Sequence, residues 1–264
     1  MAFQTKKSLG QNFLVNPHIL DRIISAAEIS KDDVILEVGP GTGNLTKKLA
    51  EKAKKVIAIE KDGRLIEPLK QTFKDRPNVE IIGGDILNTK TDFVLQSPSL
   101  SDKYKIVANI PYYITSNLLR TIFESWPKPK LIVLTIQKEV AQRIMAKLPH
   151  MNLLALSVQY YSKPEIIGYV SKNNFRPVPK VDSAIIRLGI RSQELGVRKD
   201  SKKLFSLMRM GFSEKRKQLA AVLSKKLKIK KEKILDALQK EGIDPKARAE
   251  NLSLEQWQEL TKIL

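Results

Sequence analysis

The sequence predicts an α/β fold with a mostly parallel sheet of seven strands, followed by a small all-helical domain. Three observations support this prediction. Short apolar runs alternate with helical patterns between about residues 30 and 190, the first run ends in a glycine-rich turn, and β-branched runs give way to helical periodicity after about residue 200. Alternating strands and helices imply a parallel sheet that is covered by helices on both faces.

The individual elements follow from apolar runs and helical periodicity. Apolar runs predict five parallel strands: Val34–Val38, Val56–Glu60, Val79–Gly83, Lys105–Asn109 and Leu131–Ile136. Helical patterns follow four of them: Asn44–Ala53, Gly63–Phe73, Ser116–Ser125 and Lys138–Lys147. Two more strands, Glu165–Val170 and Ser183–Ile190, have no helix between them. Because parallel neighbours need a long crossover, these two predict an antiparallel pair at the sheet edge.

The carboxyl-terminal part predicts a separate basic domain. Apolar residues at helical spacing mark three helix faces, one with Leu204, Leu207, Met208 and Phe212, one with Leu219, Val222, Leu223 and Leu227, and one with Ile234, Leu235 and Leu238. Residues 199–248 contain 16 Lys or Arg and only 6 Asp or Glu. We therefore predict a domain at 1–195 that carries the chemistry and a basic helical domain at 196–264 that binds nucleic acid, which the family resemblance described below identifies as RNA.

The amino-acid composition limits the classes of function that the chain can have. The net charge of +19 over 264 residues favours a polyanionic partner. The chain has no cysteine and two histidines, which argues against disulfides, a metal site and a Ser-His-Asp triad. No apolar run approaches the roughly 18 residues that span a bilayer. We expect a cytoplasmic monomer without a membrane partner.

A glycine-rich loop follows the first strand in the pattern E-x-G-x-G-x-G, with Glu37, Gly39, Gly41 and Gly43. Glycines let a backbone turn sharply and approach a ligand closely. A dinucleotide fingerprint would place a glycine at position 44, where Asn44 stands. S-adenosylmethionine has no phosphate, so a loop that binds it can depart from that fingerprint. The alternative is an ordinary tight turn.

Two acidic residues end the next two strands. Glu60 ends the second strand, where a carboxylate can accept hydrogen bonds from both ribose hydroxyls of a nucleoside. Asp85 follows the third strand on the same rim, where an adenine edge would lie. The alternative for each is a solvent-facing acid, but three signals on one rim support one another.

The fourth strand ends in Asn109-Ile110-Pro111-Tyr112, the most informative tetrapeptide in the chain. The amine of a nucleobase is a poor nucleophile because its lone pair is delocalised into the ring. The Asn109 side-chain oxygen and the Ile110 carbonyl can accept its N–H groups and favour tetrahedral nitrogen. Pro111 stiffens the turn, and Tyr112 can stack on an extruded base. The alternative is a structural turn with a core tyrosine.

A proline-rich loop lies between the last two predicted strands, with Phe175 at its start. The prolines hold the loop extended, so that Phe175 can form the second face of an aromatic sandwich around the base. A proline-rich connector with a core phenylalanine is the alternative.

Together these motifs resemble the KsgA/RsmA family of small-subunit ribosomal RNA adenine dimethyltransferases over nearly the whole chain. The segments that carry the resemblance are KSLGQNFL, ILEVGPGTGNLT, VIAIEKD, GGDIL, NIPYYITS, IQKEVAQRI, FRPVPKVDSA, FSEKRKQL and, near the carboxyl terminus, RAENLS. They occur in the family's order. The stretch at 148–154 departs from the family's usual Gly- or Ser-rich turn.

The resemblance implies a Rossmann-like class I methyltransferase domain that uses S-adenosylmethionine without a metal. It implies that two adjacent adenosines near the 3′ end of small-subunit rRNA are each methylated twice on N6, in the maturing small subunit. Carried over by motif, Asn12 and Leu14 would touch the cofactor through an amino-terminal segment that covers it. Gly39 would lie against its methionine part, and Asn109 would serve both the cofactor and the target amine.

Three alternatives remain open at this stage. The related Erm family methylates a large-subunit rRNA adenosine, but its glycine loop reads G-x-G-K-G-H-F-T, whereas this chain has GPGTGNLT. A DNA adenine methyltransferase would carry a larger domain for reading base edges. A non-catalytic rRNA-binding assembly factor would keep the basic surface and lose the glycine loop or the tetrapeptide, and both are intact here.

Overall fold

The computed structural model describes residues 9–88, 104–191 and 197–264. Its contacts divide the chain into two compact units, the first drawn from Met1–Ala141 and Lys163–Ile190 and the second from Gln142–Ser162 and Arg191–Leu264. The predicted domain boundary between 195 and 196 lies outside the described residues. The second unit also takes in 142–162, which the sequence assigned to the first domain.

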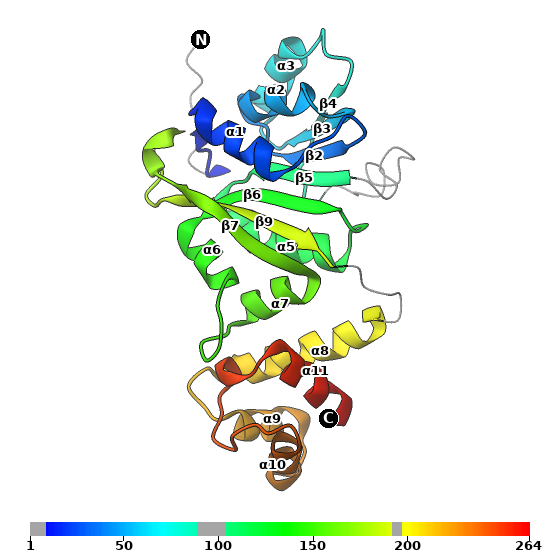
Figure 1. Cartoon of the computed structure of the whole chain (residues 1–264), viewed down its shortest axis with the longest axis vertical. Helices are drawn as coiled ribbons and strands as arrows, with labels where there is room; N and C mark the ends of the chain where they lie inside the picture. Colours follow the sequence, from blue (N-terminus) through cyan, green and yellow to red (C-terminus); the bar gives the residue numbers. More distant parts are fainter. Residues whose placement is uncertain (1–8, 89–103, 192–196) are drawn as a thin grey trace. The chain divides into compact units, whose positions relative to one another are not determined.

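The first unit is built on a sheet of seven strands. In spatial order the strands are β4 (Val79–Gly83), β3 (Lys55–Glu60), β2 (Val34–Val38), β5 (Tyr104–Asn109), β6 (Leu131–Gln137), β9 (Ser183–Ile190) and β7 (Ser162–Val170), as Figure 1 shows. The pairs β4–β3, β3–β2, β2–β5 and β5–β6 are parallel. These pairings confirm the five predicted parallel strands.

The last two strands of the sheet are β9 and β7, which confirms the predicted pair at the sheet edge. β9 pairs antiparallel with β6, and β7 is hydrogen-bonded on its outer side. The loop after β7 turns the chain back, so that β9 lies between β6 and β7. A short second sheet joins β1 (Phe13–Leu14) to β8 (Phe175–Arg176) in antiparallel pairing.

Helices of the first unit follow the strands as predicted, with one addition. They are α2 (Asn44–Ala50), α3 (Gly63–Thr72), α5 (Thr115–Glu124) and, at the boundary with the second unit, α6 (Lys138–Ile144). The sequence prediction omitted α1 (Pro17–Ala26), although its start is encoded by Asn16, which caps the helix by accepting from the His18 amide, and by a proline at the first turn. α1 and α2 pack on one face of the sheet in a common apolar core.

The second unit is helical and has a core of its own. Its helices are α7 (Leu153–Tyr161), α8 (Val197–Gly211), α9 (Leu219–Leu227), α10 (Lys231–Lys240) and α11 (Leu254–Ile263). Fully buried Trp257 lies in this core with Met208, Leu223 and Leu238. The predicted faces on α8, α9 and α10 therefore point inward. Among the residues described in either unit, no helix has the length and apolar character to cross a membrane.

Candidate functional site

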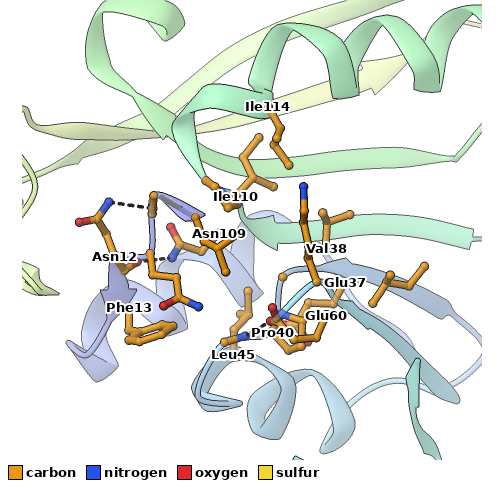
Figure 2. A pocket seen from close by; sticks show the side chains of 18 of the residues that line it. Asn12, Phe13, Glu37, Val38, Pro40, Leu45, Glu60, Asn109, Ile110 and Ile114 are labelled. Carbon is orange, nitrogen blue, oxygen red and sulfur yellow. Dashed lines mark hydrogen bonds between the residues drawn. The ribbon is translucent and has the colours of Figure 1, made fainter. Parts of the chain in front are cut away.

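A pocket lies where the loops at the carboxyl ends of β2, β3 and β5 meet. Side chains from the amino-terminal segment, the glycine loop and the end of β5 surround it (Figure 2). Ten of the predicted site residues line it: Asn12, Leu14, Gly39, Gly41, Glu60, Asp85, Asn109, Ile110, Pro111 and Tyr112. Chain segments that are far apart in sequence thus meet at one rim, as the motif order predicts.

The glycine loop forms the pocket floor. Gly39, Gly41 and Gly43 have φ angles of 70°, 60° and 81°, in the left-handed region that L side chains rarely adopt. A Cβ atom at Gly41 would also lie 2.7 Å from Cδ1 of the Phe13 ring. The amino-terminal segment can therefore pass directly over the loop only because Gly41 has no side chain.

The carboxylate of Glu60 is fixed by two backbone donors. Its Oε2 accepts from the Gly41 amide at 3.1 Å and its Oε1 from the Asp62 amide at 2.7 Å. The residue is 6% exposed, and this burial raises the pKa of Glu60 although both amide donors favour the charged form. Each oxygen has a second lone pair, so a bound diol can still be accepted.

Asp85 stands at the end of the next strand along the rim. Its Oδ2 accepts from Lys61 Nζ at 2.7 Å and its Oδ1 from the Leu87 amide at 3.1 Å. Burial works against the charged form, but the bonds from Lys61 and Leu87 outweigh it and lower the pKa of Asp85. The carboxylate is therefore held ionised as an acceptor at the pocket edge.

Asn109 ends β5 and reaches across to the amino-terminal segment. Its Nδ2 donates to the Asn12 carbonyl at 3.1 Å, which commits the amide NH₂ and leaves Oδ1 as the acceptor of the side chain. Tyr112 is held by a 2.7 Å hydrogen bond between its hydroxyl and Ser183 Oγ. Burial raises the pKa of Tyr112, so the phenol is neutral at physiological pH.

The amino-terminal segment is tied over the pocket at several points. Gln11 Nε2 donates to Asp62 Oδ2 at 2.9 Å, and Asn44 Nδ2 donates to the Leu14 carbonyl at 3.2 Å. Asp62 is itself held by Arg64, whose hydrogen bonds lower the pKa of Asp62 well below its usual range. The sequence reasoning missed this tether, and no short motif signals it because its partners are 51 residues apart.

Phe175 is the one predicted site residue that the structure places elsewhere. In β8 it pairs with Leu14 of β1, and its side chain is 0% exposed, packed in the sheet core with Leu20 and Val170. A strand alternates its side chains, so Arg176 faces outward and Phe175 inward. In this position the ring offers no free face to a base, and the predicted aromatic sandwich is wrong for Phe175.

Glu37 is a pocket residue to which the sequence assigned no role, although it opens the E-x-G-x-G-x-G pattern. It is 1% exposed, and its Oε2 has no hydrogen-bond partner among the residues that the structure describes. Burial raises the pKa of Glu37 to about 8, the nearby Thr46 hydroxyl opposes the rise, and the neighbouring Glu60 carboxylate adds to it. An orphaned buried oxygen is costly unless a ligand supplies a donor or a cation.

This set of groups fits a nucleoside that carries a cationic chain. Glu60 and Asp85 can accept from ribose and adenine donors, and the loop from Gly39 to Gly43 permits close backbone approach. The orphan oxygen of Glu37 suits an ammonium or sulfonium. Within the described ranges, no group of three or more His, Cys, Asp or Glu side chains is arranged to hold a metal ion.

Comparison with known proteins places the chain in a sequence family. Residues 2–264 match the family "Ribosomal RNA adenine dimethylase". A protein of Dehalococcoides mccartyi (strain CBDB1) is 42% identical over 259 residues, which cover 98% of this chain and 88% of that protein. A protein of Clostridium botulinum (strain Loch Maree) is 43% identical over 262 residues, 98% of this chain and 94% of that protein. Both are named "Ribosomal RNA small subunit methyltransferase A".

Two solved structures resemble the whole chain. A dimethyladenosine transferase from Plasmodium falciparum superposes with a TM-score of 0.79 and 32% identity, covering 94% of this chain and 95% of that one. The 23S rRNA methyltransferase ErmE superposes with a TM-score of 0.76 and 29% identity, covering 96% of this chain and 99% of that one. The two TM-scores are close, so fold alone does not separate the two substrates.

Proposed function

The chain belongs to the ribosomal RNA adenine dimethylase family, and we propose that its pocket transfers methyl groups from S-adenosylmethionine to N6 of two adjacent adenosines near the 3′ end of small-subunit rRNA. The chain is an rRNA adenine dimethyltransferase that acts on the small subunit, since relatives at 42–43% identity carry that activity in their name. The Erm alternative is not favoured.

The observation that carries the residue assignment is the position of Asn109. Its NH₂ is held by the Asn12 carbonyl, so its Oδ1 is the acceptor that can meet an incoming amine. The same rim carries Glu60 and Asp85, which line one pocket together with Asn109. Asn109 therefore stands between the cofactor and the target base.

The cofactor, when bound, supplies an electrophilic methyl group on a sulfonium. Asn109 Oδ1 and the Ile110 carbonyl accept hydrogen bonds from the N6–H groups of the adenosine, which draws the lone pair out of the ring. That lone pair forms the new N–C bond while the S–C bond breaks, and the amine then loses a proton to solvent. The chain contributes positioning and acceptors, which is why no histidine is needed.

Within the cofactor site we assign Glu60 to the ribose, Asp85 to the adenine amine and Gly39 to the methionine part. Glu37 adds a carboxylate for the cationic chain, because its Oε2 is buried and accepts no hydrogen bond of normal geometry within the described residues, although the Thr46 hydroxyl is near. Asn12 and Leu14 close the site from the amino-terminal side. Tyr112 stacks on the target adenine.

The second unit supplies the long-range attraction to RNA in this proposal. Exposed cations gather before and along α9: Lys215, Arg216, Lys217, Lys225, Lys226 and Lys228. Cations that displace counterions from phosphates make affinity fall steeply with salt. The predicted RNA-binding domain at 196–264 would thus add affinity without selecting the target adenosine.

The test is labelled methyl transfer to undermethylated small subunits, with large subunits assayed in parallel. We expect dimethyladenosine only in small-subunit rRNA after nucleoside analysis. Label in large-subunit rRNA would instead favour the Erm assignment. Absence of label on both, with salt-sensitive RNA binding retained, would leave the chain as a binding factor and contradict the proposal.

A further inference from the structure

An exposed aromatic ring stands near the end of β7, outside the pocket. Tyr169 is 50% exposed, whereas most aromatic side chains of the first unit are buried or half-buried. The ammonium of Lys138 lies over this ring, 5.1 Å from its centroid. A cation–π contact fixes the orientation of both groups at the surface. Neither residue takes part in the methyl-transfer chemistry described above.

Tyr169 lies on the same rim as the pocket. Lys138 directly follows β6, and its amide donates to the Asp182 carbonyl at 3.0 Å, so its side chain reaches across the start of β9. The Lys172 amide donates to Asp182 Oδ1 at 3.0 Å, which joins the end of β7 to the start of β9. β9 begins at Ser183, the residue whose hydroxyl holds Tyr112. β7 is three strand positions from β5 in the order β5-β6-β9-β7, about 14 Å at roughly 4.8 Å per strand, so Tyr169 is placed to meet a nucleotide that flanks the target and not the target itself.

The loop that follows Tyr169 is positively charged. Lys172, Arg176 and Lys180 are exposed on the loop between β7 and β9. Neither these three cations nor Lys138 forms an ion pair with an acidic side chain in the part of the chain that the structure describes. Glu139 is the exposed acid at the start of α6, and Asp182 is half-buried and occupied by the Lys172 amide. Arg176 Nη1 donates to the Asn173 and Phe175 carbonyls at 2.9 and 2.8 Å, but the positive charge of all four side chains remains available for phosphates.

Resting on the proposed function, we infer that Tyr169 and Lys138 form a stacking platform for an unpaired RNA nucleotide that flanks the target adenosine. The occupant follows from charge and shape. Single-stranded RNA is held by aromatic rings on which bases stack and by cations that follow its backbone. Because one adenosine must be extruded into the pocket, its neighbour is also unstacked and needs a new surface.

The experiment compares Tyr169→Ala and Tyr169→Phe with the unaltered chain. We expect Tyr169→Ala to weaken binding to undermethylated small subunits about 5- to 150-fold, the range measured when a base loses its stacking partner. The effect should appear in KM for the subunit, while kcat and S-adenosylmethionine affinity stay unchanged. Tyr169→Phe keeps the ring and should restore normal binding.

A matched pair of lysine variants tests the charge. Lys130 immediately precedes β6 and Lys138 immediately follows it, and both are single cations on the same unit. We expect Lys138→Ala to weaken subunit binding more than Lys130→Ala. Equal losses would show a general charge effect and overturn the platform.

Other outcomes separate the two proposals. If the unaltered chain fails to methylate small subunits, the proposed function fails. If it methylates them and Tyr169→Ala binds them equally well, only the platform is wrong. A loss of binding to subunits with unchanged binding to protein-free rRNA would indicate a ribosomal protein as the occupant, which also overturns the inference.

Discussion

The two sides of the pocket rim differ in whether their cationic side chains form ion pairs. On the cofactor side, Lys61 is paired with Asp85 at 2.7 Å and Arg64 with Asp62 at 2.6 Å. On the side of β6, β9 and β7, Lys138 and Lys172 have no acidic partner within the described residues. A small ligand binds best to groups that are already fixed, because ordering them costs free energy. A polyanion binds best where cations are still free.

Asn109 lies where the two sides meet, and its loss should have the largest effect. We expect Asn109→Ala to reduce methyl transfer about 100- to 1000-fold, by analogy with removal of one preorganised hydrogen-bonding group from an active site. RNA affinity should change little. Single-turnover methylation and RNA binding, measured on the same preparation, test this.

Asn44→Ala is the matched control for that variant. Asn44 also donates to the amino-terminal segment, through the Leu14 carbonyl, but it offers no acceptor to the target amine in our assignment. Asn44→Ala should raise the KM for S-adenosylmethionine and leave the rate at saturation unchanged. If both asparagine variants lose turnover equally, the acceptor role of Asn109 is wrong and its tether to Asn12 is what matters.

Glu60 tests the cofactor side alone. Glu60→Gln points an NH₂ at one of the two amide donors that now bind the carboxylate and weakens the acceptor for the ribose. We expect S-adenosylmethionine affinity to fall about 10- to 100-fold, since hydrogen bonds to charged groups contribute roughly 1.5–3 kcal/mol. RNA affinity should not change. Glu80→Gln, on the exposed face of β4, is the control variant. Calorimetric titration with S-adenosylmethionine measures the affinity of both variants.

Glu37 should make cofactor binding depend on pH. Its pKa is raised to about 8 by burial, so the ligand-free pocket holds it protonated at neutral pH. A cationic ligand favours the ionised form. S-adenosylmethionine affinity should therefore rise up to about tenfold between pH 6.5 and 8, relative to Glu37→Gln. Parallel pH profiles in the two proteins would contradict this role.

The same group should affect stability with the opposite sign. The pKa of Glu37 in the folded chain lies above the ordinary value of 4.5, so the folded state binds the proton more tightly. Its contribution is fully present below pH 4.5 and is lost as the pH rises through 8. Between pH 4.5 and 8, the free energy of unfolding of the ligand-free protein should therefore fall relative to that of Glu37→Gln. Denaturant unfolding of both proteins measures this difference.

The sequence was informative where local pattern decides structure. Strand runs and the positions of Gly39, Glu60, Asp85 and Asn109 could be predicted because the carboxyl ends of parallel strands share one rim. Helix α7 was missed because LLALSVQYY is apolar all round and shows no amphipathic face. Phe175 was misplaced because its burial depends on the pairing of β8 with β1, across 161 residues of chain from Leu14 to Phe175. Contacts of that range leave no periodic signal.

The smallest expected effect concerns single lysines of the second unit. It tests whether cations with and without an ion pair also differ there in their contribution to RNA binding. Lys226 is exposed on α9, while Lys262 on α11 is held by Glu259 at 2.6 Å. Lys226→Ala should weaken RNA binding only about two- to threefold and lower the slope of log affinity against log salt by roughly 0.7–0.9, the value for one phosphate contact. Lys262→Ala should leave the slope unchanged, because its charge is already compensated. Salt titrations of RNA binding decide it: equal slopes for the two variants would mean that RNA does not distinguish a free surface cation from a paired one.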